Sequence, residues 1–180
     1  MIVNMQKHNL GSIIDHSQSG DDFAPIVMKS NTTLPFMYQF YVSTFTKEDR
    51  DTDGTTERYA TSLGAQFYTY TGTADRAYST APVDLLVQDD TSAVDPAPEY
   101  WYHIALVWGA GRARFYIDGS LVQDEPLNGN PNAAVVDSKP LVIGADYPGL
   151  DEFFYGVLDD LRIYNRALSG DDVAALYAAD

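Results

Sequence analysis

The stretch WYHIALVWGAGRARFYIDGSLV, residues 101–122, decides the fold of this chain. Trp101–Trp108 is apolar on both faces, which suits a strand inside a two-sheet sandwich. Arg112–Ile117 alternates between polar and apolar residues. The pair Asp118-Gly119 then gives a strong hairpin signal before a return strand at Leu121-Val122. The stretch therefore predicts neighbouring antiparallel strands.

Further strand-like runs lie on both sides of this stretch and are separated by turn residues. They are Phe36–Phe45, Gln66–Thr71, Leu141–Gly144 and Val157–Tyr164. One helix closes the chain, because Ser169 to Asp172 has the spacing of a capping box and apolar residues follow at helical spacing. We therefore predict an all-β fold, an antiparallel two-sheet β-sandwich with a short C-terminal helix.

Composition excludes several classes of function. The 180 residues include 26 acids, 11 bases and no cysteine, and the formal net charge is −15. The absence of cysteine excludes disulfides, Cys-based zinc sites and thiol catalysis. The negative charge argues against nucleic acid as a partner, since phosphates require a basic surface. No apolar run is long enough for membrane insertion.

Four motifs carry a resemblance to a known family. They are WYHIALVW (101–108), FYIDGSLV (115–122), PLVIGAD (140–146) and FYGVLDDLRIYNRALSGDDVAALY (154–177). With them the chain resembles the laminin-G-like, concanavalin-A-like jelly-roll family in its bacterial branch. Pro25–Ser43 is similar to a strand–turn–strand of that family, and residues 45–100 show no family pattern.

The resemblance implies a jelly roll that binds glycans, proteins or calcium. Residues 1–180 are expected to form a single domain of a larger secreted or cell-surface protein. Members of the family usually begin with a strand that pairs with the C-terminal part of the fold. We expect this chain to lack that strand, because the family places it ahead of the region that corresponds to Met1–Leu10.

The best metal-binding motif lies outside the family match. Asp49, Asp51 and Asp53 alternate before Gly54, and such carboxylates can curl around one hard cation, with Glu57 as a further ligand. The chain also favours aspartate, which supplies 21 of the 26 acids and prefers turns and oxygen-ligand metal sites. Calcium is the expected cofactor, and a solvated turn is the alternative.

Asp159 is the second candidate metal ligand. Strict alternation along the strand places it on the same face as Val157, Leu161 and Ile163, and a buried carboxylate must be paired, hydrogen-bonded or metal-bound. The resemblance also implies a characteristic Asp at this position. The alternatives are a β-bulge that turns Asp159 outward and a carboxylate that accepts backbone N–H bonds.

A turn-rich loop is the candidate ligand site. Asp146, Tyr147, Asp151 and Phe154 combine carboxylates with aromatic rings, which suits the recognition of a sugar. For Phe154, packing in the core is the default alternative. Trp101 and Trp108 are expected in the core, and His103 is expected to be a satisfied core or surface residue.

These observations predict a non-catalytic, calcium-dependent carbohydrate-binding or adhesion module, located outside the cell or on its surface. One alternative is a calcium-dependent module that binds a protein or peptide. The other is a glycoside hydrolase or polysaccharide lyase on the same fold, although no two glutamates have the close spacing of the β-glucanase signature.

Overall fold

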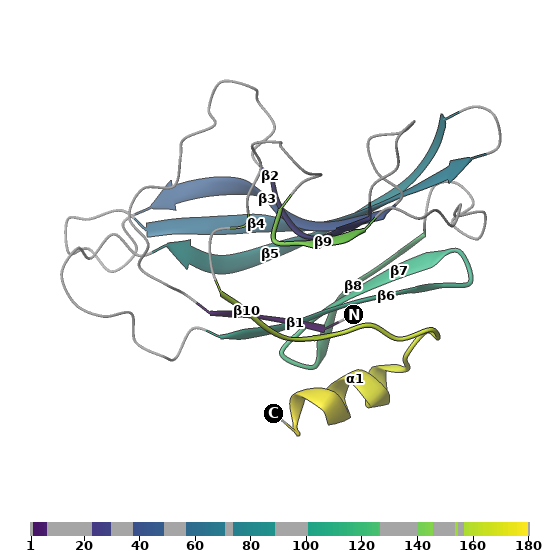
Figure 1. The fold of residues 1–180 in the computed structure, drawn as a ribbon. Helices are drawn as coiled ribbons and strands as arrows, with labels where there is room; N and C mark the ends of the chain where they lie inside the picture. The colour runs from purple at the N-terminus through teal and green to yellow at the C-terminus, as the bar shows by residue number, and fades with distance from the viewer. Residues whose placement is uncertain are drawn as a thin grey trace.

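The computed structural model describes residues 2–6, 23–29, 38–48, 57–70, 74–88, 101–126, 140–145, 154 and 157–179. Ten strands form two antiparallel sheets, which lie one above the other in Figure 1, and one helix follows the last strand. The predicted all-β sandwich with a short C-terminal helix is therefore confirmed. Most predicted strands are present with small changes in their bounds.

The first sheet contains the first and the last of the described strands. Its order is β10 (Val157–Arg162), β1 (Ile2–Gln6), β6 (Tyr102–Gly109), β7 (Arg112–Ile117) and β8 (Ser120–Pro126). β1 lies between β10 and β6 and pairs with both of them in antiparallel register. The expected lack of an N-terminal strand is thus wrong, because Ile2–Gln6 itself pairs with the C-terminal strand.

The second sheet has the order β5 (Ala74–Gln88), β4 (Glu57–Tyr70), β3 (Tyr38–Glu48), β2 (Phe23–Lys29) and β9 (Leu141–Ile143). The predicted strand Gln66–Thr71 corresponds to the end of β4, whereas the first part of β4 and all of β5 are not among the predicted strands. Pro82 lies in β5, where it is tolerated because β5 is an edge strand with an irregular register beside it.

The inner faces of the two sheets enclose the main core. Phe40 of β3 and Phe115 of β7 meet at its centre, with ring centroids 6.4 Å apart and planes inclined by 45°. Buried aliphatic residues from both sheets surround this pair: Ile26, Val27, Val42, Leu63, Ile104 and Leu106. This close packing across the two layers is the main source of cohesion in the sandwich.

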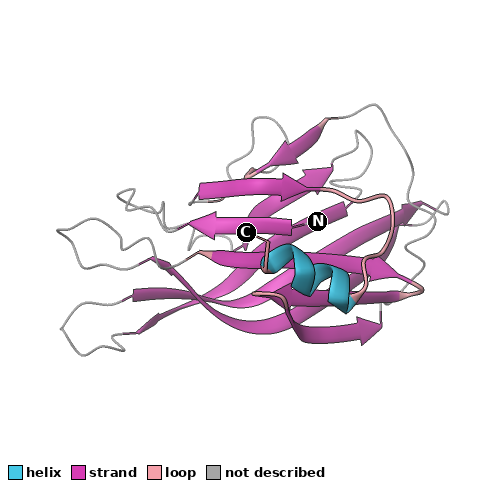
Figure 2. Cartoon of the chain, turned by 90° about the horizontal axis from the view of Figure 1, so that it is seen from below, coloured by secondary structure: helices cyan, strands magenta, loops and turns pink. Residues whose placement is uncertain are grey.

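A second apolar cluster attaches helix α1 (Gly170–Tyr177) to the outer face of the first sheet, as Figure 2 shows. Val173 of the helix and Leu168 before it pack against Ala105, Val107 and Tyr116. Figure 2 shows the helix lying across several strands of that sheet. Within the described ranges no helix is long and apolar enough to cross a membrane.

His103 lies beneath the C-terminal end of α1. Its side chain is buried, and its ring centroid is 5.6 Å from that of Tyr177. Its backbone N–H donates to Oδ1 of Asp118 at 2.9 Å, and the Asp118 N–H donates to the His103 carbonyl at 2.8 Å. The predicted hairpin turn is present, with positive φ angles of 49° at Asp118 and 73° at Gly119, which fit a type I′ turn.

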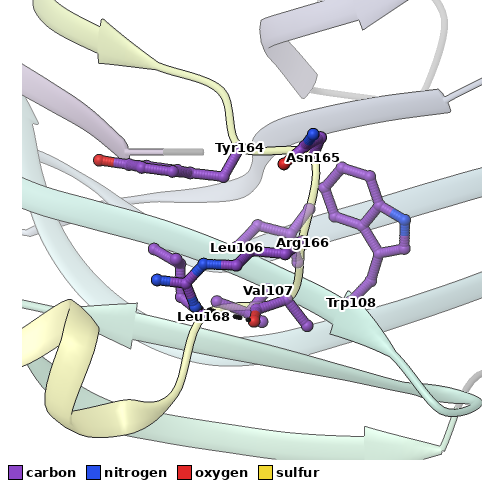
Figure 3. A pocket seen from close by; sticks show the side chains of 8 residues that line it. Leu106, Val107, Trp108, Tyr164, Asn165, Arg166 and Leu168 are labelled. Carbon is purple, nitrogen blue, oxygen red and sulfur yellow. Dashed lines mark hydrogen bonds between the residues drawn. The ribbon is translucent and has the colours of Figure 1, made fainter.

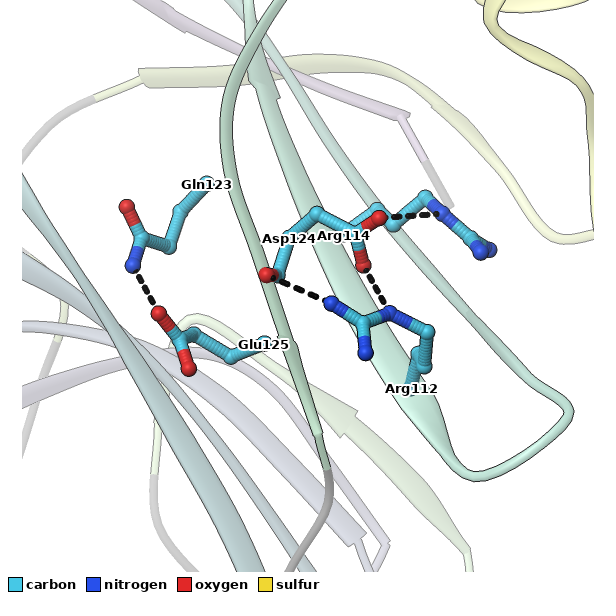
Figure 4. A network of polar contacts seen from close by, with 5 residues as sticks. All are labelled: Arg112, Arg114, Gln123, Asp124 and Glu125. Carbon is cyan, nitrogen blue, oxygen red and sulfur yellow. Dashed lines mark hydrogen bonds and ion pairs between the residues drawn. The ribbon is translucent and has the colours of Figure 1, made fainter.

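Polar contacts join β7 and β8 on the outer face of the same sheet (Figure 4). The Arg112 Nε donates to Oδ1 of Asp124 at 2.7 Å, and the Arg114 Nε donates to Oδ2 at 3.3 Å. The Arg112 Nη2 also donates to the Asp124 carbonyl at 2.9 Å. The hydrogen bond from Arg112, together with the charges of both arginines, lowers the pKa of Asp124.

Tyr41 and Gly64 form a close cross-strand pair on the outer face of the second sheet. They stand opposite each other on β3 and β4, while the neighbouring Phe40 and Val42 point into the core. The ring of Tyr41 lies so close to Gly64 that a Cβ atom at position 64 would overlap it. The ring is also largely buried, so it has little freedom to move aside.

We expect Gly64→Ala to lower the free energy of unfolding by about 1–3 kcal/mol, the usual cost of forcing an atom into a packed site. Urea unfolding measures this change. Gly170→Ala is the control, because its new Cβ would meet only ordinary contacts, the nearest 3.8 Å away. The cost should shrink in a Tyr41→Ala background, and an equal cost in both backgrounds would contradict this account.

The pairing of Asp124 with two arginines predicts a pH-dependent contribution to stability. Because the folded pKa is lowered, this contribution is present above the unfolded pKa of about 3.9 and is lost as the pH falls below it. Asp124→Asn should therefore lower the free energy of unfolding at pH 7 by about 0.5 kcal/mol, and the deficit should shrink toward pH 2.

Urea unfolding at both pH values tests this prediction. Glu125→Gln is the matched control on the same strand, where Glu125 accepts a hydrogen bond from the amide of Gln123. A deficit in Asp124→Asn that is the same at both pH values would argue against the ion pair.

Candidate functional site

The predicted calcium motif follows β3 and precedes β4. Asp49, Asp51 and Asp53 lie outside the described residues, whereas Glu57 is the first residue of β4. The register places Glu57 directly opposite Glu48, the last residue of β3.

Asp159 is exposed in β10, and the prediction that it shares the core face is wrong. Asn4 pairs with Asp159 and Ile2 with Arg162, so two steps along β1 match three along β10. This bulge, with a positive φ of 49° at Asp160, turns the side chain outward.

The bulge also changes which apolar residues of β10 point inward. Leu158 and Leu161 pack against the main core, whereas Ile163 is 53% exposed. The Asp160 N–H donates to Oδ1 of Asp159 at 2.8 Å. Both structural alternatives, the bulge and the backbone hydrogen bond, are thus confirmed for Asp159, and its role as a metal ligand stays a prediction.

The candidate ligand loop is described only at its borders. Asp146, Tyr147 and Asp151 lie outside the described residues. Phe154 is half-buried and packs against the main core, and its N–H donates to the carbonyl of Gly144 at 2.8 Å. Core packing, the alternative given for Phe154, is therefore what the structure shows, and Phe154 is not an open aromatic platform.

Among the described residues no three His, Asp or Glu side chains come together as a metal site.

A pocket of about 220 Å³ lies between β6 and the segment that follows β10 (Figure 3). Ile2, the first described residue of β1, pairs with Ala105 on one side and Arg162 on the other. Beyond these pairs of Ile2, β6 and the segment that follows β10 line the pocket from two sides. Its lining residues are Leu106, Val107, Trp108, Tyr164, Asn165, Arg166, Ala167 and Leu168.

The pocket has an apolar base and a polar rim. Leu168 and Val107 are buried, Trp108 and Tyr164 are half-buried, and Asn165 and Arg166 are exposed. Figure 3 shows Asn165 and Trp108 at one end of the pocket, with Tyr164 and Arg166 extending to the other side.

The N-terminus of α1 holds one side of this rim. Asp172 completes the predicted capping box: its N–H donates to the Ser169 Oγ at 3.1 Å, and its Oδ2 accepts the Ser169 N–H at 2.8 Å. The same Oδ2 accepts a hydrogen bond from Arg166 Nη1 at 2.9 Å. The Arg166 guanidinium and the Ser169 donors hold the pKa of Asp172 far below its ordinary value, and the bond to Asp172 raises the pKa of Arg166.

The sequence analysis did not identify this pocket. Trp108 was expected in the core, and it does pack partly against the core while also lining the pocket. Asn165 and Arg166 lie within the family motif at 154–177. The sequence signal for the pocket is the pair Asn165 and Arg166, two large polar residues between the apolar positions of β10 and those of α1.

Comparisons with known proteins agree with the fold. A laminin-G family model, described as the concanavalin A-like lectin/glucanases superfamily, matches residues 18–174. The adhesion G-protein coupled receptor V1 of Danio rerio is 30% identical over 77 residues, which are 43% of this chain and 1% of the receptor. The adhesion G-protein coupled receptor D1 of Homo sapiens is 24% identical over 102 residues, which are 54% of this chain and 12% of the receptor. The chain thus spans only a small part of these relatives.

Two solved structures show distant similarity at 16% sequence identity. An S-layer domain-containing protein from Clostridium thermocellum has a TM-score of 0.39, and the alignment covers 95% of this chain and 69% of that one. The SAP-like pentraxin from Limulus polyphemus has a TM-score of 0.43, with coverage of 98% and 75%. The identification rests on the family model, which spans most of the sequence: the chain belongs to the laminin-G-like domains of the concanavalin A-like lectin/glucanases superfamily.

Proposed function

We propose that this domain is a non-catalytic, calcium-supported binding module of a secreted or cell-surface protein, and that its ligand is a glycan. The family supports a role in binding or adhesion, since its members include domains of adhesion receptors. The fold alone does not determine the ligand. The calcium, the glycan and the location outside the cell are therefore our inferences from the residues.

One observation carries the calcium proposal. Glu48 and Glu57 are paired in the strand register where β3 ends and β4 begins, and the segment between them contains Asp49, Asp51 and Asp53. Five carboxylates therefore belong to one strand connection, and Arg50 is the base among them. Calcium takes six to eight oxygen ligands and tolerates irregular geometry, so it suits such a connection better than magnesium does.

The glycan proposal depends on polar side chains beside aromatic ones. The loop that contains Asp146, Tyr147 and Asp151 can supply hydrogen-bond acceptors and an aromatic ring, and a calcium ion can bridge carboxylates to sugar hydroxyls. A protein or peptide ligand is the second candidate, favoured by the similarity to adhesion receptors.

We expect calcium to raise the melting temperature of the domain. A ligand that binds only the folded state adds about 2.7 kcal/mol of stability at 100 times its Kd, which for a domain of this size is roughly 5–10 °C. Differential scanning calorimetry with calcium and then with a chelator measures the shift. An unchanged midpoint would reject calcium binding.

A triple variant, Asp49→Asn with Asp51→Asn and Asp53→Asn, locates the ion. It should lose the calcium response and, in chelator, should be at least as stable as the parent because repulsion among the carboxylates is reduced. Asp171→Asn, on the exposed surface of α1, is the control and should keep the full response.

A glycan array, read with calcium and with chelator, tests the ligand. Binding that requires calcium and disappears in the triple variant is the expected result. A negative array together with calcium-dependent capture of a peptide ligand, insensitive to free sugars, would assign the domain to protein recognition instead.

A further inference from the structure

We draw no further inference here: the strongest candidate, the buried side-chain cluster of Met28, Gln39 and Tyr41 on the outer face of the second sheet, where the Gln39 Nε2 donates to no described residue, carries nothing because nothing in the structure shows what covers that face.

Discussion

The seating of β1 between β10 and β6 is the constraint on which the rest of the first sheet depends. Among the described strands β10 has β1 as its neighbour and no other, because the order begins β10-β1-β6. The five residues of β1 thus hold the C-terminal strand, and with it the segment that leads to α1. The helix packs on the same sheet through Leu168 and Val173, so its position also follows from this pairing. The pocket beside Trp108 lies beyond the last strand pairs of β1, which join Ile2 to Ala105 and to Arg162.

The charges of this sheet are largely balanced where they stand. Arg112 and Arg114 share Asp124, Arg162 pairs with Asp160, and Arg166 pairs with Asp172. Of the 26 acids, 15 lie in the acid-rich stretches 48–57, 84–99 and 146–160, and Arg50 is the base within those stretches. A divalent cation would act on the part of the molecule where the excess charge is largest.

Local patterns predicted the fold well where each residue followed the regular period of its element. Arg112–Ile117 alternates without interruption and became β7 with the predicted bounds, and the turn at Asp118-Gly119 followed its hairpin signal. The capping box at Ser169 and Asp172 has a fixed spacing and was equally readable. These signals succeed because each depends on neighbours within a few residues.

The remaining features depend on contacts that no local pattern contains. The bulge at Asp160 shifted the phase of β10, so strict alternation put Asp159 on the wrong face. The sequence of β5 did not indicate a strand because it includes Pro82, which sheets tolerate only at edge strands, at the first position of a strand or at bulges. The pocket combines Trp108 with Asn165, which are far apart in sequence, and only the pairing of β1 with both flanking strands brings them together.

The antiparallel pairing of β1 with β10 also determines how the domain would respond to a mechanical load. Ile2, at the start of β1, stands opposite Arg162, at the end of β10. A pull that draws these two points apart would open the ladder from that end and break its hydrogen bonds one after another, as in a zipper. Strands loaded in shear, by contrast, must break many bonds together. A pull applied to the chain beyond α1 would first act on Leu168 and Val173, so the packing of the helix on the sheet protects the zipper end from the load.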